Sequence, residues 1–253
     1  MIILAVGMPR AGSGWHYNLV HDLMETTGCD DARDIREKFG LQGILTDVNC
    51  NIGVLSARRL IMVARPALLG HTFVIKAHSA PTVWARALIQ GGLMRATYIY
   101  RDPRDAMLSA FDYGKRVLEK QGRPNAFSHL TDFQKTMDFF VEYVDGWEKW
   151  MKIPDVMKAR YEDLLQNYDS EANKLVRFLG VKPEDPAVQA VIEKYRPGGQ
   201  VQGQQGTHFF KGQVGRFRER YSEDEQEILV RKFGATLQKM GYEVAPRSTQ
   251  GQI

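Results

Sequence analysis

Lys76 and His78 are the pair of side chains whose types and spacing suit catalysis best. They stand two positions apart where an apolar run, residues 72–77 (TFVIKA), comes to its end. Residues i and i+2 of a strand point to the same face. A histidine takes up and releases a proton near neutral pH, and a lysine beside it supplies positive charge. The pair predicts a site that removes a proton from one group while it stabilises negative charge on another.

A glycine-rich stretch, residues 7–14 (GMPRAGSG), lies between the apolar run at residues 2–6 and a helical pattern. Such a turn directs backbone N–H groups and the positive end of a helix dipole at one place, which favours a phosphate. Gly7 and Gly12 have the spacing of the nucleotide-binding sequence GxxxxGK[ST], but Ser13 occupies the lysine position. Because that lysine contacts the β- and γ-phosphates of a nucleoside triphosphate, its absence argues against an ordinary ATPase or kinase.

Arg101 and Ser109 form a third candidate group. Arg101 follows the apolar run at residues 96–100 (ATYIY), and Ser109 lies eight positions further on. An arginine at a strand end offers two parallel donors to a phosphate, and a serine two turns into the next helix adds a hydroxyl on the same side. A surface ion pair is the plainer explanation for an arginine among acids, but the arginine is in phase with the glycine turn, which favours anion binding.

The elements that must position these groups alternate between strands and helices. The buried apolar runs at residues 2–6, 72–77, 96–100 and 157–161 predict strands. Predicted helices cover residues 14–27, 131–151 and 162–179, and two more begin at Asp102-Pro103 and at Ser222. Capping boxes are expected for Thr131 with Gln134 and for Ser222 with Glu225. The alternation predicts one α/β domain over residues 1–253, with a central, mostly parallel sheet flanked by helices.

Residues 197–206 (PGGQVQGQQG) interrupt this pattern. Four glycines and four glutamines in ten residues cannot build a core. The stretch is either a flexible linker or part of a mobile segment, residues 197–217, that closes over a ligand.

Composition excludes several classes of protein. The chain has 253 residues, a formal charge of +4 and 43% hydrophobic residues, which is ordinary for a globular protein. Two cysteines without metal-ligand spacing argue against zinc and against a disulfide framework. No apolar stretch is long enough to cross a membrane, so we expect a cytoplasmic protein without a membrane partner. Residues 95–123 and 208–220 each carry a local charge of +3, which predicts a focused anion site.

The glycine turn resembles the 5′-phosphosulfate loop of the sulfotransferases that use 3′-phosphoadenosine 5′-phosphosulfate (PAPS), whose usual form is Pro-Lys-Ser-Gly-Thr-Thr-Trp. Residues 9–15 (PRAGSGW) keep its proline, glycine and tryptophan. Arg10 replaces the lysine, Ala11 the serine, and Ser13 and Gly14 the two threonines. The planar fork of an arginine can still bind a sulfuryl or phosphate oxygen, although it is not an equivalent point charge.

Further segments resemble motifs of the same family and follow in the family's order. Residues 76–78 (KAH) are similar to Lys-Thr-His, and residues 101–109 to a 3′-phosphate motif that begins Arg-Asn-Pro-Lys-Asp. Residues 160–163 (RYED) resemble Tyr-Glu-Asp. Residues 210–217 (FKGQVGRF) are similar to Arg-Lys-Gly-x-x-Gly-Asp-Trp, with Phe210 and Arg216 in place of its arginine and aspartate. A histidine in the second motif is typical of the cytosolic small-molecule branch.

The resemblance implies a P-loop-like sulfotransferase fold and transfer of a sulfuryl group from PAPS to a hydroxyl or amine, which leaves adenosine 3′,5′-bisphosphate (PAP). It implies that His78 is the catalytic base and that Lys76 and Arg10 stabilise the transferring group. Trp15 is expected to pack on the adenine. The cofactor-binding residues that it implies are Arg10, Ala11, Gly12, Ser13, Gly14, Trp15, Arg101, Ser109, Tyr161, Lys211 and Gly212. No metal is expected, because the histidines show no metal-ligand spacing.

The sequence says least about the acceptor substrate. Several aromatic residues would suit a small hydrophobic or aromatic alcohol: Trp84, Phe111, Tyr113, Phe139 and Phe140. Aromatic residues at helical spacing more often belong to a core. Two alternatives to the enzyme are a nucleotide-dependent small-molecule kinase of related fold and an inactive protein that binds PAPS or PAP. A nucleic-acid-binding module is disfavoured, because acids lie between the basic residues. The sequence does not indicate an oligomeric state.

Overall fold

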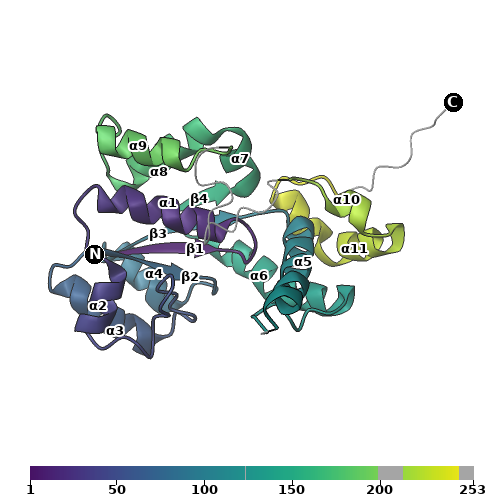
Figure 1. The fold of residues 1–253 in the computed structure, drawn as a ribbon, viewed down its shortest axis with the longest axis horizontal. Helices are drawn as coiled ribbons and strands as arrows, with labels where there is room; N and C mark the ends of the chain where they lie inside the picture. The colour runs from purple at the N-terminus through teal and green to yellow at the C-terminus, as the bar shows by residue number, and fades with distance from the viewer. Residues whose placement is uncertain (123, 199–212, 245–253) are drawn as a thin grey trace.

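The described part of the chain forms a sheet of four parallel strands. The computed structural model describes residues 1–122, 124–198 and 213–244. The strands are β1 (Ile2–Gly7), β2 (Phe73–Ala77), β3 (Met94–Tyr100) and β4 (Val156–Arg160). They are ordered β2-β1-β3-β4 (Figure 1), and every pairing is parallel. All four predicted strands are confirmed, with ends that move by two residues at most.

Helices cover both faces of the sheet and its carboxyl end. They are α1 (Ser13–Glu25), α2 (Ala32–Lys38), α3 (Ala57–Leu68), α4 (Val83–Gln90), α5 (Pro103–Gln121), α6 (Phe133–Met151), α7 (Tyr161–Gln166), α8 (Tyr168–Leu179), α9 (Pro186–Lys194), α10 (Phe217–Arg220) and α11 (Glu223–Lys239). In Figure 1, α1, α8 and α9 lie on one side of the sheet, and α2, α3 and α4 lie on the other. Helices α5, α10 and α11 lie beyond the carboxyl ends of the strands. The predicted α/β domain with a parallel sheet is confirmed.

Two hydrophobic cores form because the strands are apolar on both faces. One contains Ile3, Val74 and Ile99 with buried residues of α1, α8 and α9. The other contains Ile2 and Phe73 with buried residues of α3, α4 and α6. A strand that is buried on both sides must be a continuous apolar run, which explains why residues 2–6 were recognisable in the sequence.

The order in which strands are added to the sheet reverses at β1. The chain leaves β1 for β2 on one side and then returns past β1 to β3 on the other. In open parallel sheets, ligands bind outside the carboxyl ends of the strands at such a reversal. The turn that follows β1 and the residues that follow β2 and β3 therefore meet at one edge.

Helix starts agree with the sequence at two positions and differ at a third. Asp102 caps α5 through the N–H of Arg104, and Ser222 forms the predicted capping box with Glu225. The predicted capping box at Thr131 is wrong, because Asp132 accepts the N–H of Lys135 and α6 begins one residue later. A carboxylate next to the threonine is an equally good cap, so the sequence offered two neighbouring starts.

The predicted helix over residues 162–179 is two helices, α7 and α8, that meet at Asn167.

Both cysteines, Cys29 and Cys50, are free thiols. In the parts of the chain described, no helix has the length and apolar character that crossing a bilayer requires. Most of the glycine- and glutamine-rich stretch, and with it most of the proposed closing segment, lies outside the described residues.

Candidate active site at the carboxyl ends of the strands

The glycine turn between β1 and α1 is packed tightly at both ends. A Cβ at Gly7 would lie 2.6 Å from that of Ser13 and 2.8 Å from Ile99. At Gly12, which has a φ of 77°, a Cβ would lie 2.7 Å from the ring of Tyr161. Real Cβ atoms do not approach other atoms this closely, and a left-handed φ disfavours any side chain. The turn therefore requires glycine at both positions and rests directly on Tyr161.

The first turn of α1 leaves its backbone N–H groups available. Its N-cap is Gly12, which has no side chain that could accept them, and its first turn holds no acidic residue. Ser13, Gly14 and Trp15 supply the first amides of the helix, and Ala11 before them is fully buried. A helix N-terminus without a carboxylate keeps its partial positive charge for an anion. The predicted phosphate-binding turn thus has a geometry that fits a phosphosulfate group.

His78 lies just beyond β2 and hydrogen-bonds to the end of β1. Its Nδ1 is 2.6 Å from the carbonyl oxygen of Gly7. Because a carbonyl only accepts, Nδ1 donates and Nε2 keeps its lone pair. Burial, with a smaller effect from the charge of Lys76, lowers the pKa of His78 to about 4. The ring is therefore neutral at neutral pH, which is the state that a general base requires.

Lys76 is a buried cation on the face of β2 that packs against α1. Only 4% of its surface is exposed, and its Nζ lies 5.9 Å from the centre of the Tyr17 ring. Burial, followed by the charge of Arg10, lowers the pKa of Lys76 to about 8. Among the described residues, no carboxylate is close enough to oppose this shift. An anion in the turn would supply the missing negative charge.

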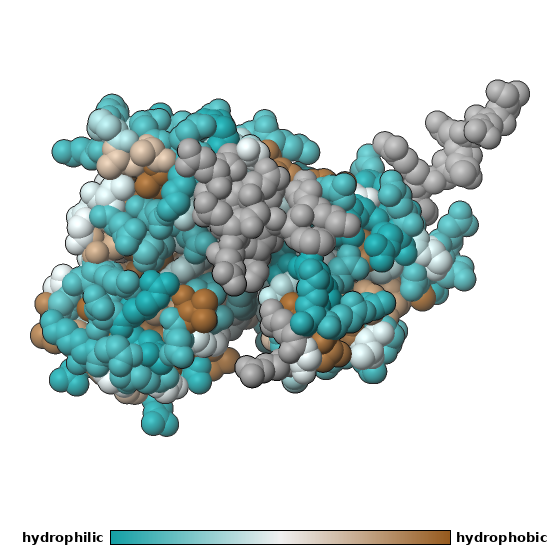
Figure 2. Space-filling model, viewed as in Figure 1, coloured by the Kyte–Doolittle hydropathy of each residue, from teal (hydrophilic) through white to brown (hydrophobic). Residues whose placement is uncertain are grey.

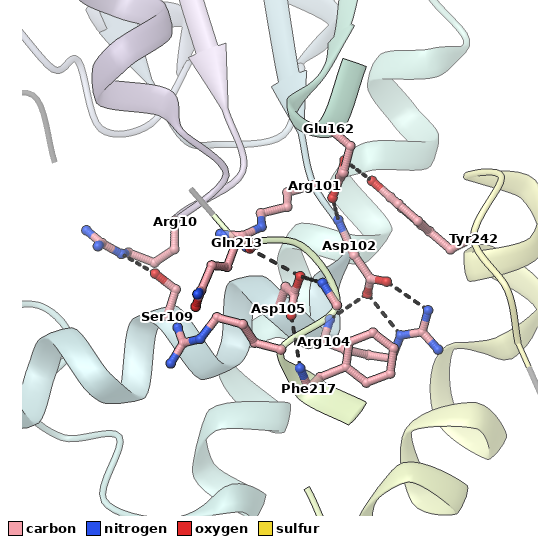
Figure 3. Close-up of polar contacts among 12 residues, drawn as sticks. Arg10, Arg101, Asp102, Arg104, Asp105, Ser109, Glu162, Gln213, Phe217 and Tyr242 are labelled. Carbon is pink, nitrogen blue, oxygen red and sulfur yellow. Dashed lines mark hydrogen bonds and ion pairs between the residues drawn. The ribbon is translucent and has the colours of Figure 1, made fainter. Parts of the chain in front are cut away.

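Arg10 turns from the glycine loop toward α5. Its Nε donates to Oγ of Ser109 at 3.4 Å, and its guanidinium carbon lies 4.2 Å from the centre of the Tyr113 ring. Figure 3 shows the side chain pointing away from Arg101. Burial lowers the pKa of Arg10 to about 10, so that it stays charged at neutral pH. Two predicted cofactor residues, Arg10 and Ser109, are therefore in contact. The roles expected for them in binding the cofactor remain predictions.

Arg101 follows the carboxyl end of β3, and its buried Nε donor makes no hydrogen bond to the described residues. Its Nη2 donates to Asp105 at 3.3 Å and to the carbonyl of Gln213 at 2.6 Å (Figure 3), and the guanidinium lies over the ring of Tyr161 at 4.6 Å. Its Nε is buried and has no hydrogen-bond partner among the residues described. An unpaired buried donor on a cation is costly, and it fits the 3′-phosphate that the resemblance places here.

Asp105 is a structural anchor of the site, in a role that the sequence did not reveal. One of its carboxylate oxygens accepts the N–H of Gly215 at 2.6 Å, and the other accepts the N–H of Phe217 at 3.1 Å (Figure 3). The same side chain accepts from Arg101. Asp105 therefore fixes the segment before α10 against the start of α5. Gly215 and Phe217 lie more than 100 positions away in the chain, so no local pattern could have indicated this role.

Glu162 and Tyr242 extend this framework toward the C-terminal helix. Glu162 accepts the backbone N–H of Asp102 at 3.2 Å, and the hydroxyl of Tyr242 donates to it at 2.8 Å (Figure 3). Burial raises the pKa of Glu162. The network ties the end of β4 to the start of α5.

Trp15 is a core residue in this structure. Its indole N–H donates to the carbonyl of Tyr195 at 3.0 Å, and its ring stacks on Tyr168. Only 4% of its surface is exposed. The indole therefore fixes α1 against α8 and α9, and its expected contact with adenine remains a prediction. Two other predicted cofactor residues, Lys211 and Gly212, lie outside the described residues.

Several basic residues of the two intervals with a basic surplus, 95–123 and 208–220, form ion pairs in the described part of the chain. Arg104 pairs with Asp102 at 2.7 Å. Arg216 pairs with Asp112 at 2.8 Å, and Arg218 with Glu243 at 2.9 Å. Asp102 and Asp112 are acids that the charge count already included, and of these three partners only Glu243 lies outside the two intervals. The pairs therefore remove little of the surplus, and a focused anion site remains a prediction.

Two further histidine sites lie on α1. His16 is buried, and its Nε2 lies 2.9 Å from Oγ1 of Thr97. Burial, followed by the charge of Lys76, lowers the pKa of His16 to about 4. His21, Asp22 and Glu25 place possible ligand atoms within 4.8 Å of one another, but Asp22 is already bound by Lys194 at 2.6 Å. Its position on the outer turns of α1 separates this group from the glycine turn.

A comparison with protein families shows to which family the chain belongs. A model of the sulfotransferase domain matches residues 2–241. This chain belongs to the sulfotransferase family. The match spans all of the motifs that the sequence suggested, and membership supports sulfuryl transfer as the general chemistry.

Curated relatives of this sulfotransferase are distant. Sulfotransferase 6B1 of Danio rerio is 27% identical in a 144-residue alignment that covers 52% of this chain and 48% of the relative. A 3-alpha-hydroxysteroid sulfotransferase of Cavia porcellus is 27% identical in a 103-residue alignment that covers 36% of this chain and 33% of the relative. The chain thus matches half or less of the length of each.

Solved structures of sulfotransferases share the fold. Mouse sulfotransferase SULT7A1, in complex with PAP, superposes with a TM-score of 0.59 at 14% identity, over 93% of this chain and 83% of that one. Retinol dehydratase, in complex with androsterone and PAP, gives 0.58 at 17% identity, over 93% of this chain and 80% of that one. The predicted P-loop-like sulfotransferase fold is confirmed.

Proposed function

We propose that this sulfotransferase transfers the sulfuryl group of PAPS to a hydroxyl or amine of a small-molecule acceptor, with His78 as the general base. The observation that carries the proposal is the 2.6 Å contact between Nδ1 of His78 and the carbonyl of Gly7. It couples the base to the last residue of β1, at the start of the phosphosulfate loop. It also leaves Nε2 as the proton acceptor.

The chemical step is an in-line displacement at sulfur. The acceptor O–H gives its proton to Nε2 of His78 as its oxygen forms a bond to sulfur. The bond between sulfur and the bridging phosphate oxygen breaks, and PAP leaves with the electron pair. Lys76 and the first amides of α1 are the groups that would stabilise the charge on that oxygen. Their positive charge is not neutralised by carboxylates of the described residues.

Arg101 is the main candidate for holding the 3′-phosphate, supported by its buried and unpaired Nε. Ser109 and Lys211 would add donors, and Tyr161 and Trp15 would flank the nucleotide as the resemblance implies. No metal takes part in the proposed step. The residues 197–217 are proposed to close over the bound nucleotide, and Asp105 provides an anchor at the end of that segment.

The acceptor that we propose is a small hydrophobic or aromatic alcohol. Rings of Phe127, Phe139, Phe140 and Tyr143 contact one another beside Arg10, and together they give this end of the molecule an apolar character. The names of similar proteins point the same way, since they mention a hydroxysteroid and androsterone. Of the aromatic residues in the sequence, Phe140 is fully buried core and Trp84 lies exposed elsewhere.

Thermal unfolding with added nucleotide tests the proposal. PAP at about 100 times its dissociation constant should stabilise the chain by about 2.7 kcal/mol, or about 5 to 10 °C. ATP at the same concentration should have a much smaller effect, because the loop lacks the lysine for the β- and γ-phosphates. Stronger stabilisation by ATP would instead favour the kinase alternative.

Activity needs a separate measurement. Transfer of labelled sulfate from PAPS to a panel of phenols, sterols and aliphatic alcohols should detect a product. Stabilisation by PAP without transfer to any acceptor would favour the inactive, nucleotide-binding alternative. A cytoplasmic location, supported by the two free cysteines, is part of the proposal.

A further inference from the structure

Large hydrophobic residues with exposed surfaces are concentrated in one part of the chain. Eight of the ten found among the described residues lie between positions 48 and 84: Val48, Val54, Ile61, Met62, Leu68, Leu69, Val83 and Trp84. The surface in Figure 2 is mostly hydrophilic, with separate hydrophobic patches, some along the side where Figure 1 shows α2 and α3. Isolated exposed hydrophobic residues are common, but a cluster in one region indicates a surface that contacts something.

Helix α3 is apolar on both faces. Its inner face contributes Leu60 and Val63 to the core. Its outer face carries Ile61, Met62 and Leu68, which border an open hollow together with Arg65 and the C-cap residue Leu69. Leu68 and Leu69 are 72% and 65% exposed. The outer residues recur at helical spacing, so they form a continuous stripe rather than scattered positions.

Helix α4 adds two exposed apolar residues near the start of α3, where Oγ1 of Thr82 donates to the carbonyl of Leu55. It packs beside α3, and its first residues, Val83 and Trp84, are 72% and 55% exposed. We call the outer stripe of α3 with these two residues the α3–α4 surface. Tryptophan is enriched where proteins meet the boundary between lipid and water, because its ring is apolar and its N–H is polar.

The charges of α3 have one sign. The helix carries Arg58, Arg59 and Arg65 and no Asp or Glu. The whole interval 48–101 holds no acid either, although two of its basic residues, Lys76 and Arg101, lie in the candidate active site. Arg58 and Arg65 lie on the exposed face of α3, among the apolar residues. A surface of this kind is complementary to one that is apolar and anionic.

We propose that the α3–α4 surface docks on an anionic lipid bilayer. Helix α3 would lie in the plane of the headgroups, with its leucines, Ile61 and Trp84 in the acyl boundary and its arginines at the lipid phosphates. A helix that lies on a bilayer needs no membrane-spanning length. The proposal therefore differs from the expectation of no membrane partner, because that expectation rested only on the lack of a membrane-spanning segment. The inference does not depend on the proposed function.

A second copy of the chain fits this surface less well. Pairing of two identical faces about a twofold axis would bring Arg58 and Arg65 of both copies together. No carboxylate within positions 48–101 would compensate them. An acidic protein partner would be a different interaction, and the experiment below separates it from lipid.

Trp84 provides a direct probe. The other tryptophans, Trp15, Trp147 and Trp150, are at least 95% buried. Mixing the full chain with vesicles of phosphatidylcholine and phosphatidylserine should shift its fluorescence to shorter wavelength, and Trp84→Phe should abolish the shift. Pure phosphatidylcholine vesicles should give a much smaller shift, and added salt should weaken binding. No shift and no co-sedimentation with anionic vesicles would overturn the proposal.

Paired variants identify the groups responsible. Ile61→Gln with Leu68→Gln should weaken co-sedimentation at least tenfold, and Arg58→Gln with Arg65→Gln should weaken it by about fivefold per arginine. Matched controls are Leu118→Gln, an exposed leucine on α5, and Arg231→Gln with Lys232→Gln on α11. The controls should bind as the wild type does, and all variants should keep its unfolding midpoint. Equal loss in the controls would contradict the proposal. So would a dimer in sedimentation that Leu68→Gln dissociates, because a second copy would then cover the face.

Discussion

The two halves of the candidate site treat their cations in opposite ways. On the side of the glycine turn, Arg10 and Lys76 have no carboxylate near them among the described residues, and their pKa values are lowered. On the side of α5, Arg104 and Arg216 are each paired with an aspartate at less than 3 Å. The second side is a scaffold held by ion pairs. The first side keeps positive charge that only a bound anion can balance.

This difference separates structural charges from functional ones. Pairing neutralises an arginine, so that it contributes to the fold and offers little to a ligand. Unpaired buried cations lower stability, and a folded protein retains them where they bind something. Arg101 shares features of both halves, because it pairs with Asp105 while its Nε has no hydrogen-bond partner in the part of the chain that the structure describes.

The largest expected effect is at the base. His78→Asn keeps an N–H for the carbonyl of Gly7 but removes the proton acceptor, so turnover should fall by about 100- to 10,000-fold. Sulfuryl transfer from PAPS measures the rate, and thermal stabilisation by PAP should survive. The exposed His129→Asn is the matched control. Near-normal turnover in His78→Asn would show that another group is the base.

A fall in pH should destabilise the protein through the buried histidines on the side of the glycine turn. The pKa of His16 is about 4 in the folded state against 6.5 for the free side chain, so the unfolded chain binds its proton first as the pH falls. The free energy of unfolding should therefore decrease between pH 6.5 and 4, by about 3 kcal/mol for this group. Urea unfolding at pH 7 and 4.5 should show a drop about 2 kcal/mol smaller in His16→Gln. The exposed His129→Gln should keep the wild-type drop, and equal drops in all three proteins would contradict the assignment.

A pair of charge removals tests the comparison itself. Lys76→Met should weaken PAP binding by about 10- to 100-fold, because it removes a charged donor for which the described residues supply no carboxylate. Arg216→Met should change it by less than about threefold, since that charge is already neutralised by Asp112. Isothermal titration provides both constants. Equal losses would mean that paired and unpaired cations do not differ in function.

The smallest expected effect concerns the scaffold. Asp105→Asn retains the shape of the side chain but loses the charge that accepts from Arg101 and from two backbone N–H groups. We expect a loss of about 1 to 2 kcal/mol in the free energy of unfolding, with turnover at saturating PAPS largely retained. Urea unfolding measures it, with the exposed Asp138→Asn as the control. A large loss of turnover without a loss of stability would move Asp105 from the scaffold into the catalytic site.

The parts of the site that the sequence predicted are those attached to the ends of strands. The apolar runs that become β1, β2 and β3 fix where the glycine turn, Lys76 and Arg101 must lie, because parallel strands end at one edge. Each of these groups was visible within ten residues of a buried run. The fold class followed from the same runs.

The parts that the sequence did not predict depend on contacts between distant segments. Asp105 reaches Gly215 across 110 positions, and Arg218 is neutralised by Glu243 from a later segment. Neither is visible as a local pattern. The direction of the Arg10 side chain was equally hidden, since it depends on Ser109 and Tyr113 of α5.

Calorimetric titration with PAP, repeated in buffers of different ionisation enthalpy, tests the account most directly. The pKa of Lys76 is about 8, so about half of these side chains are unprotonated at pH 8, and an anion beside them should raise the pKa. We expect one PAP to bind per chain with an uptake of about half a proton at pH 8, and no uptake in Lys76→Met. Binding of PAP without proton uptake, or no binding, would contradict the claim that the glycine turn holds an uncompensated cationic site.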